Sequence, residues 1–151
     1  MILLSRRSML GIAAVVDIAI HARLGPVSAK ALAARHNLPP RHLETLLQAL
    51  VKAGILKGVR GPRGGYALAR ERRKIMAGDI VRAAMSSQFE DDDHPTPESR
   101  LVDTIVAPTV RVAGEAFLSA LDRYSIEEMC QAADAKNVFA GEKDSMVDFT
   151  I

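Results

Sequence analysis

The sequence predicts a mainly α-helical protein with one small β-ribbon. Hydrophobic residues make up 48% of the 151 residues, but aromatic residues only 4%, with no Trp, so the core must be built from aliphatic side chains. Apolar residues recur at helical spacing through most of the chain. Two short strands are indicated, on either side of a loop rich in Gly, Pro and Arg at residues 60–65.

Two helices are predicted in the first 36 residues. Apolar side chains recur at helical spacing over residues 8–22, and a Gly-Pro pair ends this helix. Ser28 is a good N-cap for a short second helix over residues 29–36, and Asn37 supplies its closing turn residue. The apolar face expected for the first helix comprises Met9, Ile12, Ala13, Val16, Ala19 and Ile20.

A third helix, over residues 40–53, has one apolar and one polar face. It begins at a proline pair, because proline is tolerated in the first turn of a helix, and Gly54 supplies its left-handed stop. Its leucines follow the i, i+3, i+4, i+7 pattern of a buried stripe. The opposite face is polar and long enough to contact a partner; it carries Arg41, His42, Glu44, Thr45, Gln48 and Lys52.

The predicted strands cover residues 55–59 and 66–68 and form a hairpin. Its tip carries Arg60 and Arg63 among the glycines Gly61, Gly64 and Gly65, so it is flexible and positively charged. A fourth helix follows over residues 77–84.

The second half of the chain is expected to contain a linker, two helices and a flexible tail. The linker clusters Pro, Ser, Asp and Glu without periodicity. A long helix over residues 99–124 should bend or restart near Pro108, and Ser125 with Glu128 forms a capping box for a last helix over residues 126–136. The predicted organisation is a DNA-binding domain over 1–85, an acidic linker loop over 86–98, dimerisation helices over 99–136 and a tail over 137–151.

Charge divides the chain into opposing parts. Residues 1–86 hold 15 Lys or Arg and four Asp or Glu, a formal charge of +11, whereas the remainder, with five and 14, carries −9. A basic region of this kind is typical of a protein that binds a polyanion, and nucleic acid is the leading class of partner. A short helix, a turn, a second helix with a polar face and a basic ribbon also follow the order of a winged helix-turn-helix.

The residues of this region resemble a known family. The stretches "HLETLLQALVKAGILKGVRGPRGGYALA" over 42–69 and "IMAGDIVRA" over 75–83 closely resemble the BadM/Rrf-type bacterial transcriptional regulators, which include IscR-, NsrR- and CymR-like proteins. The similarity covers about 135 residues, with the wing its most specific part. It implies a homodimer, paired through the long helix, that binds palindromic double-stranded promoter DNA.

The resemblance also implies roles for individual residues. Arg41, His42 and Glu44 match recognition-helix positions that face the bases in relatives, and Arg60 matches a wing arginine that enters the minor groove. Pro39 stands where well-known members have Ser, which puts the target sequence in doubt. Ser28 and Lys30 suit phosphate contacts, and Arg6 and Arg7 are either further phosphate contacts or solvated. The remaining DNA-binding candidates are Thr45, Gln48, Arg63, Gly64, Gly65 and Tyr66.

Cluster-binding members of the family place three cysteines in the linker, where iron is held by thiolates. Here residues 86–100 read "SSQFEDDDHPTPESR" and lack cysteine, so no iron–sulfur cluster and no other cofactor is expected. An acidic cluster there is interpreted as a solvated loop, with a divalent metal site as the alternative; it comprises Asp91, Asp92, Asp93 and His94. Cys130, the single cysteine, is either a buried packing residue or a redox switch that forms a disulfide between subunits.

These observations predict a cytoplasmic transcriptional regulator, acting as a repressor in response to an unknown small-molecule or redox signal. No catalytic constellation is present, so an enzyme is not expected. The early apolar stretch is short of the roughly 20 residues that span a membrane, and Asp17, His21 and Arg23 interrupt any export signal. Two alternatives stay open: a winged-helix module that binds proteins, and a thiol or ligand sensor whose DNA binding is secondary.

Overall fold

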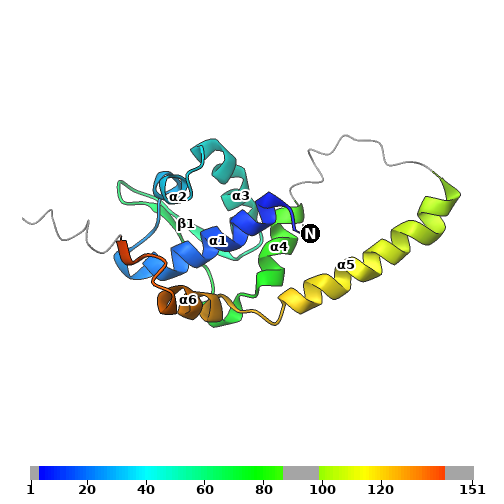
Figure 1. The fold of residues 1–151 in the computed structure, drawn as a ribbon. Helices are drawn as coiled ribbons and strands as arrows, with labels where there is room; N and C mark the ends of the chain where they lie inside the picture. Colours follow the sequence, from blue (N-terminus) through cyan, green and yellow to red (C-terminus); the bar gives the residue numbers. More distant parts are fainter. Residues whose placement is uncertain (1–3, 87–98, 142–151) are drawn as a thin grey trace, which may run out of the picture.

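The structure, a computed structural model, describes residues 4–86 and 99–141. Its described elements form a helical body from which one long helix projects (Figure 1). Helices predominate, and two short strands form an antiparallel ribbon. The helices and strands are α1 (Arg6–His21), α2 (Ala29–Arg35), α3 (Pro40–Lys52), β1 (Leu56–Val59), β2 (Gly65–Leu68), α4 (Ala77–Ser86), α5 (Ala107–Leu121) and α6 (Ile126–Ala135).

Helix α1 crosses the body and contacts α3, α4 and α6 (Figure 1). Its buried residues include Gly11, Val15 and Ile18, whereas Met9, on the face predicted to be apolar, is 47% exposed. Ala19 of that predicted face is buried, and Ile12, Val16 and Ile20 are half-buried against the core, so the prediction is wrong at Met9 but holds in part. Because α1 is covered from more than one side, its apolar residues surround most of the helix and no single stripe marks the buried face.

The helix-turn-helix is built as the sequence predicts. The Ser28 hydroxyl accepts a hydrogen bond from the Ala31 N–H at 3.1 Å, so it caps α2. Asn37 ends this helix at φ +53°, and Gly54 follows α3 at φ +74°. The four leucines of α3 are completely buried and hold the helix on the core; they are Leu43, Leu46, Leu47 and Leu50.

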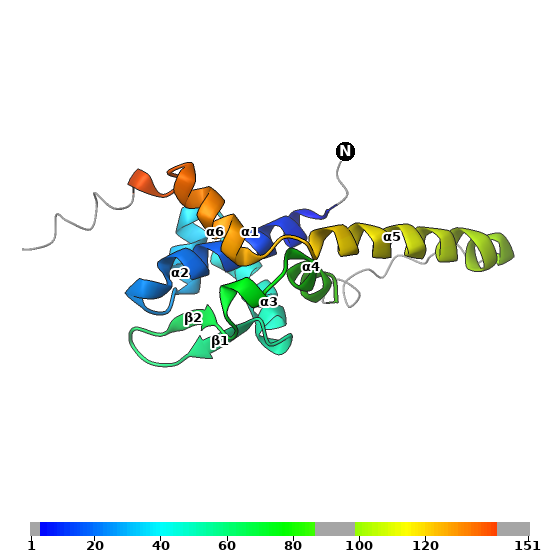
Figure 2. The ribbon, with the colours of Figure 1, turned by 90° about the horizontal axis from the view of Figure 1, so that it is seen from below.

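The β-ribbon is attached to the segment that precedes α2. Strands β1 and β2 pair in antiparallel register, with Val59 opposite Gly65 at the end near the tip. Two hydrogen bonds join Tyr66 to Val27, from the Val27 N–H at 2.9 Å and from the Tyr66 N–H at 2.8 Å. The wing is therefore joined directly to the helix-turn-helix (Figure 2).

Helix α6 belongs to the core of the body. Ser125 and Glu128 form the predicted capping box, and Ile126 and Cys130 are buried among the core residues. The helix packs on α1 (Figures 1 and 2). The apolar face of α6 is therefore used within its own chain, and the predicted grouping of residues 99–136 as dimerisation helices stays a prediction.

Helix α5 projects away from the body and has few neighbours in its own chain (Figures 1 and 2). The predicted irregularity near Pro108 is a π-helical turn, Val102–Val106, immediately before α5. Proline has no N–H to donate and its ring crowds the carbonyl one turn earlier, so the regular hydrogen-bond ladder cannot continue there. By length and composition alone Val102–Leu121 could also cross a membrane, and none of its residues is buried.

Candidate nucleic-acid interface

The outer face of α3 presents its polar side chains to solvent. Arg41, Glu44 and Gln48 are exposed and lie along one side of the helix, opposite the buried leucines. His42 and Thr45, also predicted site residues, are exposed beside them. A helix of this width fits the major groove of B-DNA, where Arg, Gln and Glu side chains reach base edges. The structure therefore brings the predicted recognition residues together on one surface.

Arg7 of α1 also reaches this surface, which is more than the sequence indicated. Its guanidinium donates a hydrogen bond to the Thr45 hydroxyl at 3.3 Å. Arg6, Arg7 and His42 border an open hollow of about 420 Å³ between the start of α1 and the start of α3; its other lining residues are Leu10, Leu38 and Pro39. The basic pair Arg6-Arg7 is visible in the sequence as a possible phosphate contact. Its position beside α3 follows only from the fold.

The wing carries its charge at the tip. Arg60 and Arg63 are exposed: Arg60 precedes, and Arg63 lies within, a tight turn closed by a 2.9 Å hydrogen bond from the Gly64 N–H to the Gly61 carbonyl. The ribbon lies at the edge of the body (Figure 2). Two exposed arginines on a narrow ribbon are suited to phosphates or to the minor groove, where the negative potential is strong.

Three predicted wing residues have a role inside the protein. A Cβ on Gly64 would lie 2.3 Å from the Val59 carbonyl oxygen, and one on Gly65 would lie 2.4 Å from that of Val27. Tyr66 is half-buried against the core. Both glycines are therefore required by close approaches of the chain's own backbone. Whether they also contact DNA stays a prediction.

Ser28 and Lys30 lie at the start of α2. Both side chains are exposed, and the Ser28 oxygen already accepts the cap bond from Ala31. Its hydroxyl hydrogen remains able to donate to a phosphate oxygen. Lys30 supplies a positive charge close by, so both positions suit backbone contacts that carry no sequence information.

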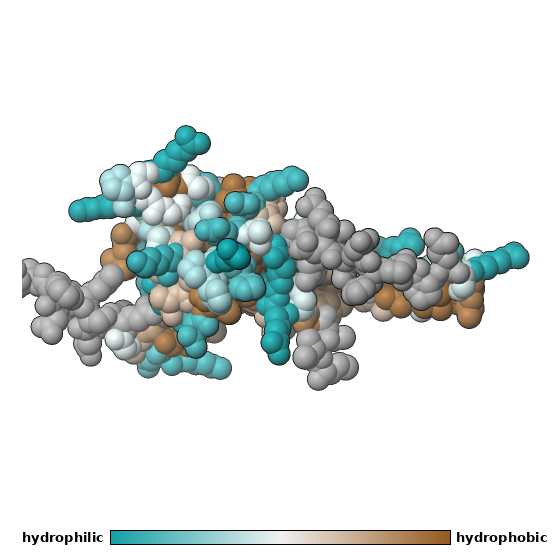
Figure 3. All heavy atoms as spheres, turned by 90° about the horizontal axis from the view of Figure 1, so that it is seen from above, coloured by the Kyte–Doolittle hydropathy of each residue, from teal (hydrophilic) through white to brown (hydrophobic). Residues whose placement is uncertain are grey.

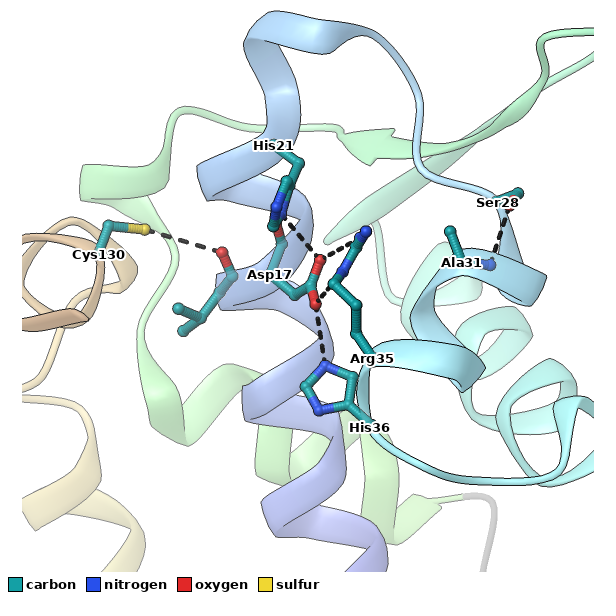
Figure 4. A network of polar contacts seen from close by, with 8 residues as sticks. Asp17, His21, Ser28, Ala31, Arg35, His36 and Cys130 are labelled. Atoms are coloured by element: carbon teal, nitrogen blue, oxygen red, sulfur yellow. Dashed lines mark hydrogen bonds and ion pairs between the residues drawn. The ribbon is translucent and has the colours of Figure 1, made fainter. Parts of the chain in front are cut away.

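A buried ionic cluster connects α1 to the end of α2 (Figure 4). The Asp17 carboxylate is completely buried and accepts two hydrogen bonds from Arg35, at 2.9 and 2.6 Å. His36 Nε2 lies 3.0 Å from the same carboxylate and His21 Nδ1 lies 3.1 Å from it. No local sequence pattern predicts this Asp17 cluster, because Asp17 and His36 lie 19 positions apart. The cluster fixes α2 against α1 and so positions the helix-turn-helix.

Cys130 occupies a buried position in α6. It is 1% exposed, and its Sγ lies 4.0 Å from the Val16 carbonyl oxygen of α1 (Figure 4). Burial raises the pKa of its thiol above the ordinary value, although Arg72 opposes this effect. Because the thiolate is the reactive form, these features favour a packing role over the redox switch.

Known proteins resemble this chain along most of its length. The sequence pattern of the Rrf2 family, described as iron-dependent transcriptional regulators, matches residues 4–132. The protein slr0846 of Synechocystis sp., named as a regulator of the HTH type, is 32% identical over 139 residues, which are 92% of this chain and 95% of that protein.

Solved structures of transcriptional regulators have a fold similar to that of this chain. CymR, the global cysteine regulator of B. subtilis, is 27% identical with a TM-score of 0.65, covering 87% of this chain and 98% of that chain. An IscR of T. potens is 34% identical with a TM-score of 0.64, covering 87% and 88%. Both similarities extend beyond the winged helix-turn-helix, since they cover most of each chain.

The family description mentions iron, which would need suitable donor side chains in this chain. Iron–sulfur clusters are held by several thiolates, and this chain has one cysteine, which is buried in α6. Within residues 4–86 and 99–141, no three His, Cys, Asp or Glu side chains are grouped so that they could hold a metal ion. Asp91, Asp92, Asp93 and His94 lie outside the described residues. The donor set does not fit a thiolate-held cluster.

Proposed function

This chain belongs to the Rrf2 family of transcriptional regulators, and from this premise we propose that it is a cytoplasmic, sequence-specific repressor that binds a palindromic operator as a homodimer. The observation that carries the proposal is that the exposed polar face of α3 and the exposed arginines of the wing tip belong to one body, in which β1 contacts α3 and β2 is bonded to the segment before α2. In this proposal α3 enters the major groove, while Arg60 of the wing enters the adjacent minor groove.

The uncovered apolar surface of α5 supports pairing with a second copy. Val106 and Val110, one turn apart, are 43% and 64% exposed, and further exposed apolar residues surround them. Figure 3 shows hydrophobic side chains along the projecting helix. Asp103, Arg111 and Glu115 interrupt this stretch, and a charge in the middle of a bilayer costs roughly 2.5–3.5 kcal/mol or more. The helix therefore suits a partner helix, with its charges at the rim, better than a membrane.

A two-fold dimer explains why the operator should be palindromic. Each protomer presents one α3 and one wing, and the two-fold axis of the dimer is matched by a two-fold axis in the DNA. The signal that releases the DNA acts without an iron–sulfur cluster in this proposal, because the chain lacks the thiolates. The burial of Cys130 makes the thiol-sensor alternative the weaker one.

Affinity for duplex DNA measured against salt tests the proposed DNA binding. Neutralising several phosphates releases counterions, so the affinity should fall by about 10³ or more between roughly 50 and 200 mM salt. Binding that does not depend on salt, or no binding to any duplex, would contradict the proposal and favour a module that binds proteins. No chemical turnover by the purified chain is expected.

Replacing Arg60 with alanine should weaken binding to the operator by about 5- to 150-fold. The exposed guanidinium at the wing tip is then missing from the narrow, electronegative minor groove. The preference for A·T base pairs at that position should relax as well, and fluorescence anisotropy with operators that differ there measures both effects. Arg70→Ala serves as a control, because this arginine instead donates to the Gly54 carbonyl at the end of α3. Unchanged affinity and A·T preference in Arg60→Ala would exclude the minor-groove role.

Replacing Glu44 with alanine should change the base preference more than the overall affinity. A carboxylate can accept a hydrogen bond from cytosine N4, but it is repelled by the phosphates around it. We expect the variant to bind non-specific DNA as well as or better than the unchanged protein, and to discriminate less at one operator base pair. An equal loss of affinity on all sequences would show that Glu44 does not read a base.

A further inference from the structure

The end of α5 is held against α4 by a joint that involves both backbone and side chains. The Ala77 N–H donates to the Tyr124 carbonyl, and the Ile126 N–H donates to the Ile75 carbonyl, each at 2.9 Å. These bonds form a short antiparallel bridge between the segment before α4 and the turn after α5. The two hydrogen bonds fix the position of the chain where α5 leaves the body.

A paired arginine and aspartate lie on the same joint. Arg82 of α4 donates two hydrogen bonds to the Asp122 carboxylate at the end of α5, one to each oxygen at 2.8 Å. The paired guanidinium holds the pKa of Asp122 below its ordinary value. This two-pronged arrangement restricts orientation as well as distance, which a single contact would not do.

Gly78 brings the two helices into direct contact at this point. A Cβ on Gly78 would lie 1.9 Å from the Asp122 Oδ1 atom and 3.0 Å from the Leu118 carbonyl oxygen of α5. The last turn of α5 therefore lies directly on the backbone of α4. A side chain at position 78 would displace the Asp122 carboxylate and crowd the Leu118 carbonyl.

Small rotations at this joint become large displacements at the far end of α5. The helix has 15 residues. At 1.5 Å per residue it is about 22 Å long, so a tilt of about 10° moves its far end by about 4 Å. One base-pair step of DNA is about 3.4 Å. A dimer that pairs through α5 would therefore couple the angle at this joint to the distance between its two DNA-reading surfaces.

We propose that Asp122, which lies against Gly78, and its partner Arg82 are positioning residues that determine which half-site spacing the dimer accepts. This inference rests on the proposed function, because it requires a dimer that pairs through α5 and binds two half-sites. The pair sets the angle between the DNA-reading surface and the dimerisation helix. It contacts neither the DNA nor the second protomer in this account.

The test measures the affinity of the full chain for a series of duplexes that carry two half-sites separated by different spacers. The unchanged protein should show one optimal spacing, with affinity at least about tenfold lower one base pair away on either side. Asp122→Ala should reduce this ratio to less than about threefold, because a freed α5 accepts neighbouring spacings. Gly78→Ala, whose methyl group displaces the Asp122 carboxylate from Arg82, should reduce the ratio in the same way.

Controls separate positioning from folding. Asp122 and Arg82 are partly exposed, so removing their pair should leave the thermal unfolding temperature, the dimer and the affinity for a single half-site nearly unchanged. Arg82→Ala should reproduce Asp122→Ala. Glu127→Ala is the matched control: it removes a similarly exposed ion pair, to Arg72, that does not involve α5, and it should keep the original spacing preference.

The possible outcomes distinguish this inference from the proposed function. If the unchanged protein shows a sharp optimum and Asp122→Ala and Arg82→Ala keep it, the joint does not determine spacing and the inference is wrong while the proposed function stands. If the unchanged protein binds no duplex with two half-sites, the proposed function fails and the inference fails with it.

Discussion

Replacing Asp17 with alanine should lower the free energy of unfolding by about 3–5 kcal/mol, as expected when one partner of a buried ion pair is removed. The carboxylate is completely buried and is contacted by Arg35, His36 and His21 (Figure 4). Without it, the Arg35 guanidinium, whose side chain is 21% exposed, loses both bonds to a negatively charged partner. Urea denaturation followed by circular dichroism measures the loss.

The control for Asp17 is Glu71, a carboxylate that also pairs with an arginine but at the surface. Its contact with Arg73 is exposed on both sides, so Glu71→Ala should hardly change the unfolding midpoint. Because the Asp17 cluster fixes α2 against α1, the Asp17 variant should also lose specific DNA binding at temperatures where it is still folded. A loss of stability of less than about 1 kcal/mol would show that the cluster contributes little, because buried pairs normally cost more to break.

Replacing both Val106 and Val110 with aspartate should convert the dimer into a monomer and weaken operator binding by at least about a hundredfold. Two charges would have to be buried in an apolar interface, which costs several kcal/mol each without partners. A monomer binds only one half-site, so it loses the additional affinity that a dimer gains by binding two linked half-sites. Sedimentation velocity and titration of the operator measure the two effects.

Alanine at positions 106 and 110 provides the control for the added charge. Val106→Ala with Val110→Ala removes methyl groups without adding charge, so it should weaken the dimer without abolishing it. Neither substitution touches the body of the protein, because both side chains are exposed on the projecting helix. The affinity for a single half-site should therefore stay the same in both variants. A stable dimer in the aspartate variant would place the dimer interface elsewhere.

The fold could be predicted where local signals and tertiary packing agree. Helix α3 combines a proline start, a leucine stripe on one side and a glycine stop, and it was located to within one residue. The start of α6 was also predicted correctly, from the capping box of Ser125 and Glu128. The buried face of α1 could be predicted only in part, because a helix covered from several sides is apolar on several sides.

The candidate site was predicted in part. Exposed residues of α3 and of the wing tip follow from a polar face and a basic hairpin, both of which are local patterns. Other features depend on segments that lie far apart in the sequence: the Asp17 cluster, the contact of Arg7 with Thr45, and the close approach of Gly65 to the Val27 carbonyl. Single-sequence patterns do not contain such contacts. The position of α6 on the core was missed for the same reason.

Selection of bound sequences from random duplex DNA, with the purified full-length chain, tests the central claim most directly. The account predicts enrichment of one palindrome with two half-sites, whose affinity then falls steeply as salt is raised. No enrichment, or enrichment of a single unrepeated site bound by a monomer, would contradict a dimeric sequence-specific regulator.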